Sequence, residues 1–115
     1  MKVLRKGEIL LDDCLFACSF WSRTRGYIGK KEISTDEGIF FVSCNSVHMW
    51  FMSASLDLIF LRKTGDRYLV SSYVENVKPW AILPLSDFKA SETLEVASGL
   101  IRAKKIRQGD ELCIA

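Results

Sequence analysis

The stretch LDLIFLRKTGDRYLVSSYVENV, Leu56–Val77, holds two runs rich in aromatic and β-branched residues on either side of a short polar segment. Residues of these types are typical of strands. The polar segment TGDR, Thr64–Arg67, is typical of a turn, because its glycine can adopt a positive φ. The pattern therefore predicts a β-hairpin over Leu56–Val77, and it favours a mainly β fold.

Further short strands are expected on both sides of this hairpin. The segment KVLRKGEILL, residues 2–11, alternates around Gly7 and predicts a hairpin or a bent strand. The other expected strands are CLFAC (14–18), GIFFV (38–42), SVHMWFM (46–52), ETLEVA (92–97) and ELCI (111–114). Consecutive short strands joined by turns favour a compact antiparallel β-sandwich or a barrel-like fold.

Two short helices are expected within this β-rich chain. Residues 19–29, SFWSRTRGYIG, place apolar side chains at helical spacing, with Ser19 as an acceptable N-cap. Near the C-terminus, Ser98 is expected to cap a second helix, GLIRAKKI, residues 99–106. The predicted class is therefore mainly β, or α+β, with two short helices.

Length, composition and charge indicate one ordinary globular domain over residues 1–115. The chain has 115 residues, of which 49% are hydrophobic, so it can bury a core of its own. Its net charge is only +2, which does not indicate a nucleic-acid partner. It has no apolar run of the roughly 20 residues that a membrane span needs, and no signal peptide is recognisable. We therefore expect a cytoplasmic protein with no membrane partner.

The cysteines and the single histidine bear on metal binding. No export signal accompanies the four cysteines, so they are expected to be reduced thiols that pack as small apolar residues. With one histidine, a zinc site would require three or four ligands to converge from scattered positions. No metal and no cofactor are therefore expected.

Three motifs in order resemble a known family. They are WSRTRGYIGK (21–30), EGIFFVSCNSVHMWFMSASLDLIFL (37–61) and LEVASGLIRAKKIRQGDEL (94–112). Their order and spacing resemble the DUF192 family, also called UPF0127, over nearly the whole chain. The resemblance implies a compact β-rich domain that is similar to a jelly roll. It implies no chemistry, since the family's name records an unknown function.

The expected strand around the only histidine is the first place to look for a site. Alternation places Cys44, His48, Trp50 and Met52 on one mixed face, which could be the wall of a groove. Asp57 is an acid among apolar residues, and burial without partners would be costly. A tight hairpin near residues 52–55 would bring Asp57 opposite His48 or Trp50, although a single sequence does not fix this register.

These side chains favour a small binding or accessory domain over an enzyme. The groove could hold a small anionic or aromatic ligand, with Arg23 as a further donor. The candidate ligand-binding residues are His48, Trp50, Met52, Asp57, Cys44 and Arg23. The partner is an unknown small molecule or protein, and the oligomeric state is open.

Three other interpretations stay open. The first is a hydrolase or transferase using His48 and Asp57, with Cys44 as a possible nucleophile. Its weakness is the ~13 Å between Cys44 and His48 along a flat strand at ~3.3 Å per residue. The second is purely structural, with Asp57 bonded to backbone amides in a neighbouring loop. The third and weakest is a metal or nucleic-acid binder. The nucleic acid would meet a basic cluster made of Arg102, Lys104, Lys105 and Arg107 together with Lys2, Arg5 and Lys6.

Overall fold

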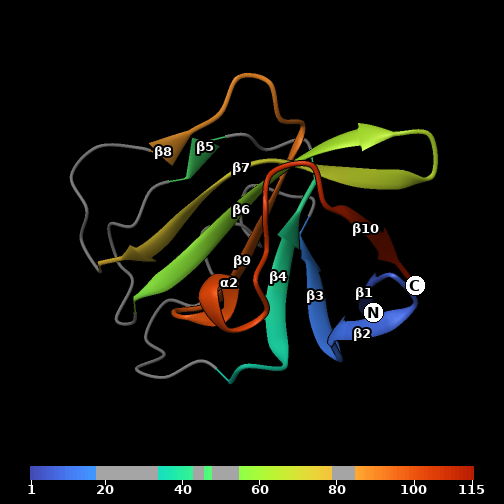
Figure 1. Cartoon of the computed structure of the whole chain (residues 1–115). Coiled ribbons are helices and arrows are strands. Elements are labelled where there is room, and N and C mark those ends of the chain that lie inside the picture. Colours follow the sequence, from blue (N-terminus) through green and yellow to red (C-terminus); the bar gives the residue numbers. More distant parts are fainter. Residues whose placement is uncertain (18–33, 43–45, 48–54, 79–84) are drawn as a thin grey trace.

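The computed structural model describes residues 1–17, 34–42, 46–47, 55–78 and 85–115, and most of them belong to one sheet (Figure 1). Eight strands form this mixed sheet in the order β2-β1-β10-β7-β6-β9-β4-β3. Their bounds are β1 Val3–Arg5, β2 Glu8–Leu11, β3 Asp13–Ala17, β4 Glu37–Phe41, β6 Leu56–Thr64, β7 Arg67–Val77, β9 Glu92–Ala97 and β10 Glu111–Ile114. The mostly β class predicted from the sequence is confirmed. Among the described residues, no helix is long and apolar enough to cross a membrane.

The predicted central hairpin is confirmed as β6 and β7. The two strands pair from Thr64–Arg67 at the turn to Leu56–Val77 at the far end. Gly65 has a φ of 61°, the positive value expected of the turn glycine. β6 then pairs on its other edge with β9, with Asp57 opposite Val96 and Leu58 opposite Glu95. Because β7 and β9 flank it on both sides, β6 is an interior strand.

One strand pair differs from the expected antiparallel arrangement. β3 and β4 are parallel, in register from Asp13–Glu37 to Ala17–Phe41. Parallel neighbours cannot be joined by a tight turn, and the chain between them is long enough for the crossover that they require. The sheet is therefore mixed.

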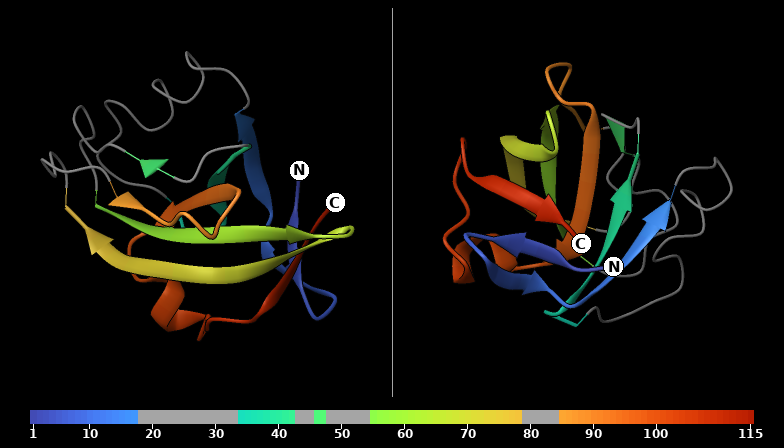
Figure 2. Two further views of the ribbon diagram at one scale, coloured as in Figure 1. Left: turned by 90° about the horizontal axis from the view of Figure 1, so that it is seen from above. Right: turned by 90° about the vertical axis from the view of Figure 1, so that its right-hand side faces the viewer.

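The N-terminal segment links the two ends of the strand order. β1 and β2 form a hairpin, one of the two alternatives predicted for residues 2–11, with Lys6 at φ 53° and Gly7 at φ 76° in the turn. A single residue, Asp12, separates β2 from β3, although these strands stand at opposite ends of the sheet order. In addition, the Cys14 amide donates to the Met1 carbonyl at 2.9 Å. Figure 2 shows the N-terminus, the C-terminus and β3 on the same side of the molecule.

Both faces of the central strands are buried. One face contributes to a single apolar core that also receives side chains from β1, β2, β3, β7, β10 and the C-terminal helix. Its central members are Cys14, Phe40, Ile59, Leu61, Leu94 and Val96. The opposite face of the same strands carries Ile39, Phe41, Leu56, Leu58, Phe60, Thr93, Glu95 and Ala97, all of them buried. Strands buried on both faces have no solvent-facing side, which is why β9 is buried along its whole length.

The C-terminal helix differs from its prediction. α2 spans Leu100–Ala103, shorter than the expected residues 99–106, and its N-cap position is Gly99 rather than Ser98. Gly99, at the N-cap position, has a φ of 95°. Glycine adopts this conformation easily, whereas a serine at the N-cap position would be strained in it. The other expected helix, residues 19–29, lies outside the described residues.

The expected pairing of the 44–52 strand with β6 is wrong. Along Leu56–Leu61 both edges of β6 are hydrogen-bonded, one to β7 and the other to β9, and a strand has only two edges. Of the expected strand 46–52, the structure describes only β5, Ser46–Val47, which pairs instead with β8, Leu85–Ser86, in a separate two-stranded sheet. Asp57 therefore cannot be a ladder partner of His48 or Trp50.

Candidate functional site

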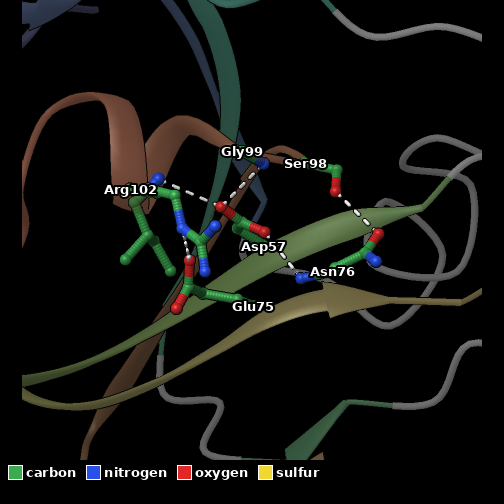
Figure 3. Close-up of polar contacts among 7 residues, drawn as sticks. Asp57, Glu75, Asn76, Ser98, Gly99 and Arg102 are labelled. Carbon is green, nitrogen blue, oxygen red and sulfur yellow. Dashed lines mark hydrogen bonds and ion pairs between the residues drawn. The ribbon is translucent and has the colours of Figure 1, made fainter.

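Asp57 is fully buried, and its carboxylate accepts three backbone hydrogen bonds. Oδ1 accepts from the Asn76 amide at 2.7 Å, and Oδ2 accepts from the Gly99 and Ile101 amides, each at 3.0 Å (Figure 3). The last two amides belong to the first turn of α2, where backbone N–H groups lack partners within the helix. Asp57 therefore caps α2 from a distant strand, and Gly99 needs no side-chain cap.

A β-bulge aims the Asn76 amide at Asp57. β7 pairs through Val77 with Leu56 and through Val74 with Leu58, so Glu75 and Asn76 together lie opposite Asp57. Asn76 has a φ of 52°, a left-handed conformation that asparagine tolerates better than most residues. The extra residue turns its N–H toward the carboxylate. One side chain thus joins β6, β7 and α2.

Side chains around this carboxylate strengthen the same junction. The Ser98 hydroxyl donates to the Asn76 side-chain oxygen at 2.9 Å, and Arg102 Nε lies 3.8 Å from Glu75 Oε1 (Figure 3). Both contacts connect the start of the α2 segment to the end of β7. Ser98, which was predicted to cap the helix, therefore hydrogen-bonds to a side chain of β7 instead. The contacts of Asp57 match the structural interpretation, in which it bonds backbone amides.

Glu95 is a second buried carboxyl, and its surroundings are the reverse of those of Asp57. It lies in β9 between Ile39 of β4 and Leu58 of β6, and its residue exposure is 4%. No hydrogen bond or ion pair joins its carboxyl to any residue in the described ranges. Burial raises the pKa of the Glu95 carboxyl from its ordinary value of 4.5 to about 8. At neutral pH this group is therefore mainly a neutral carboxylic acid.

The two carboxyls lie on opposite faces of the sheet. Asp57 is opposite Val96 and Leu58 is opposite Glu95, and successive residues of a strand point to opposite faces. Asp57 faces the side that α2 covers. Figure 2 shows β5 on the other side of the β6–β9 strands from α2, so β5 lies on the side that Glu95 faces.

Sequence reasoning singled out Asp57 and missed Glu95. The remaining candidates, Cys44, His48, Trp50, Met52 and Arg23, lie outside the described residues, so their role as site residues stays a prediction. A signal for Glu95 existed in LEVA, residues 94–97, where one acid interrupts an otherwise apolar run that a buried strand would produce. The run identified the strand, but it did not reveal that both faces would be buried.

Cys14, the buried one of the two described cysteines, is not an activated thiol. Cys14 and Cys113 are both free, and Cys14 is buried. Burial raises the pKa of the Cys14 thiol from 9.0 to about 11, although the N-terminal ammonium acts in the opposite direction. A thiol with a raised pKa is a poor nucleophile at neutral pH.

The third interpretation gains no support in the described part of the chain. Among those residues, no group of three His, Cys, Asp or Glu side chains is placed to hold a metal ion. In the predicted basic cluster, Arg5 lies against the loop after α2, with its Nη1 3.3 Å from Asp110 Oδ2. This pairing reduces the positive charge that the cluster offers to a phosphate backbone.

Comparisons with solved structures show which known proteins share this fold. Two solved structures share the fold: a protein of unknown function from Novosphingobium aromaticivorans and a protein from Sinorhizobium meliloti that is provisionally described as a transcription regulator. The first has a TM-score of 0.79 at 21% identity, covering 96% of this chain and 81% of that one. The second has a TM-score of 0.75 at 20% identity, covering 96% and 88%. At these identities the likeness concerns the fold alone.

The family assignment comes from the sequence itself. No curated protein matches the chain. A protein-family profile, DUF192, described as an uncharacterized ACR, matches residues 3–114, which is nearly the whole chain. The motifs that suggested this family include both LDLIF, with Asp57, and LEVASG, with Glu95 and Gly99. The chain therefore belongs to the DUF192 family, whose function is unknown.

Proposed function

We propose that this chain is a small binding domain whose ligand meets the sheet face that carries Glu95. The observation that supports this proposal is the lone carboxyl of Glu95 in a buried apolar setting. A buried polar group without a hydrogen-bond partner costs free energy, roughly 1–3 kcal/mol, and native proteins satisfy nearly all such groups. A ligand that bonds this carboxyl would supply the partner that the described residues do not.

The contacts of Asp57 support its exclusion from the ligand site. All three of its hydrogen bonds go to backbone amides that have no other described acceptor, and none of its surface is exposed. A ligand that took these bonds would leave the first turn of α2 without its cap. We therefore assign to Asp57 the task of holding α2 on the sheet.

The other predicted residues remain part of the proposal. Cys44, His48, Trp50, Met52 and Arg23 are proposed to line the ligand site together with Glu95. What supports the link is that β5 lies on the Glu95 side of the sheet and that His48 follows Val47, its last residue, directly. An aromatic, a thioether and an imidazole would suit a mainly apolar pocket with a few polar groups.

Mapping ligand contacts by NMR tests the proposal. A library of small cationic, neutral and anionic compounds is added to ¹⁵N-labelled protein, and the backbone amide shifts are followed. We expect at least one compound class to shift the amides of Ile39, Leu58 and Glu95 more than those of Gly99 and Ile101. Glu95→Gln should weaken this response about tenfold or more, because a charged or acidic partner is replaced by an amide.

Glu111→Gln is the matched control. Glu111 is an exposed glutamate of β10 that pairs with Arg67 of β7 at 2.6 Å, so its loss should leave the response unchanged. Absence of any shift at millimolar ligand, or shifts confined to the Asp57 junction, would refute the proposed site.

Two finer features of the molecule are also part of this proposal. We propose that the sheet curls into a barrel-like form, supported by the single residue between β2 and β3 and by the Met1–Cys14 hydrogen bond. We also propose a cytoplasmic location, supported by the free thiols of Cys14 and Cys113.

A further inference from the structure

The chemistry of the Glu95 face limits which ligands it can take. This inference rests on the proposed function and deepens it. We propose that the Glu95 carboxyl binds the ammonium group of a ligand that carries an aromatic or alkyl body, and that the carboxyl gives up its proton on binding. No covalent bond forms or breaks except the O–H bond of Glu95. Its proton passes to the solvent, and the ammonium–carboxylate pair remains.

The lack of a described charged partner for Glu95 favours a cation. On the Glu95 face, the other titratable side chains of β4 and β6 are Glu37 and Arg62, which lie two and four residues along their strands from the residues opposite Glu95. Glu37 accepts from the Ser34 amide, and Arg62 is exposed. Asp87, beyond the end of β8, is another carboxylate on this side, but it accepts from the Ser72 hydroxyl and the Lys89 amide. A lone buried carboxyl stays protonated, and an opposite charge within about 4–6 Å favours its ionised form. Ammonium–carboxylate hydrogen bonds are also roughly twice as strong as neutral ones.

Two phenylalanines favour an organic cation over a bare ion. Phe41 and Phe60 lie on the strands flanking β9, and both are aligned with Thr93. Thr93 is two residues from Glu95 and therefore on the same face. Each ring is thus a diagonal neighbour of the carboxyl, within reach of a ligand bound there. Aromatic rings attract ammonium groups through their faces and pack against apolar ligand bodies.

Burial of the carboxyl agrees with this ligand class. A pKa of about 8 means that the acid is mainly protonated below that pH, so the pair can form only with loss of one proton. A hydrophilic cation would lose its hydration without gaining apolar contacts. For an amphiphilic amine, burial of its apolar body offsets part of the free energy that desolvation of its ammonium group costs.

Isothermal titration calorimetry with matched probes tests this inference. The probes are phenethylammonium, its neutral isostere phenethyl alcohol, the anion 3-phenylpropionate, and methylammonium, which has no apolar body. Titrations at about pH 6.5 in buffers of different ionisation enthalpy count the protons released. We expect phenethylammonium to bind at least tenfold more tightly than the other three probes, with release of about one proton.

Two variants check that Glu95 is responsible. Glu95→Gln should weaken phenethylammonium binding about tenfold or more and abolish proton release. Glu95→Met, which removes the polar group altogether, should do the same and serves if the glutamine variant folds poorly. Glu111→Gln should leave both quantities unchanged.

The outcomes separate this inference from the proposed function. If phenethyl alcohol binds as tightly as phenethylammonium, or if no proton is released, the cation inference fails while a ligand site at Glu95 stands. If none of the four probes binds while NMR mapping finds a different compound class at this face, the ligand class is wrong. If nothing binds by either method, both proposals fail.

Discussion

Asp57 and Glu95 lie on the adjacent strands β6 and β9, one residue pair apart, yet their carboxyl groups point to opposite faces of the sheet. The first is bonded to three backbone amides, and the second has no described partner. Both are buried. The two carboxyl groups therefore have different surroundings, because residues one position apart along paired strands point to opposite faces of the sheet.

Loss of the Asp57 carboxylate should destabilise the fold strongly. In Asp57→Ala the amides of Asn76, Gly99 and Ile101 lose their acceptor in a buried setting, and we expect a loss of about 3 kcal/mol in the free energy of unfolding. Urea unfolding followed by circular dichroism measures it. Asp66→Asn, in the exposed turn of the hairpin, is the control and should change the free energy by less than about 0.5 kcal/mol. A loss for Asp57→Ala as small as that of the control would contradict the capping role.

Glu95 should make the stability depend on pH in a definite direction. Its folded pKa is raised to about 8 from 4.5, so the folded state binds the proton more tightly than the unfolded chain. The stabilisation from Glu95 is therefore fully present below about pH 4.5 and is lost as the pH rises through about 8, with an upper bound of about 5 kcal/mol on the loss. Glu95→Gln cannot titrate, so its stability should fall less over this range.

Chemical unfolding at about pH 5 and about pH 8.5 compares the two proteins. The difference between the wild-type and Glu95→Gln pH dependences isolates Glu95 from every other titrating group. A ¹³C NMR titration of the Glu95 carboxyl in the folded protein gives its pKa directly. If the stabilities of the wild type and of Glu95→Gln change equally with pH, or if the pKa of the Glu95 carboxyl is near 4.5, this carboxyl is not held in an apolar setting.

Gly38 should resist enlargement because of close contacts on the Asp57 face. A Cβ at this position would lie 2.8 Å from Leu11 Cδ1 and 2.9 Å from the Glu95 carbonyl oxygen. The carbonyl belongs to the β9 backbone and cannot move freely, so Gly38→Ala should cost about 1–3 kcal/mol. Thermal and urea unfolding measure the loss.

Gly7→Asn serves as the control for Gly38→Ala. A Cβ at Gly7 meets nothing within 4 Å, and asparagine tolerates its positive φ of 76°. Gly7→Asn should lower the free energy of unfolding by less than about 1 kcal/mol. Equal losses for the two variants would show that the strand spacing at Gly38 relaxes easily.

Thiol labelling should distinguish the two described cysteines. Burial and a raised pKa protect Cys14, whereas Cys113 is half-buried in the last strand. With a thiol reagent at about pH 8, we expect Cys14 to react at least tenfold more slowly than Cys113, as read by peptide mass spectrometry. Labelling in denaturant should make the two rates similar. Faster reaction at Cys14 in the native state would contradict its burial next to the β3–β4 pair.

Local patterns predicted the elements that depend on neighbouring residues. The β6–β7 hairpin followed from two β-rich runs around a glycine turn, and the β1–β2 hairpin followed from alternation around Gly7. β9 and β10 followed from short apolar runs. In each case the information lies within a few residues, because turn geometry and side-chain alternation are local.

Contacts between distant segments were not predictable in the same way. The parallel β3–β4 pair, the position of β9 between β6 and β4, and the cap from Asp57 to α2 join residues that are far apart in the chain. The expected pairing of the histidine strand with β6 failed because β6 already has two neighbours. The pattern of one strand does not specify which other strand occupies each edge.

The sequence by itself determined the mostly β class, the family, the two hairpins and the presence of an acid within each of two apolar runs. Only the tertiary structure decided what each acid does. Asp57 meets the unpaired amides of α2 and of the β7 bulge, whereas Glu95 lies between the apolar residues Ile39 and Leu58 and has no described partner. The physical reason is that burial and hydrogen bonding depend on what packs against a residue, and for both carboxyls those neighbours come from other strands.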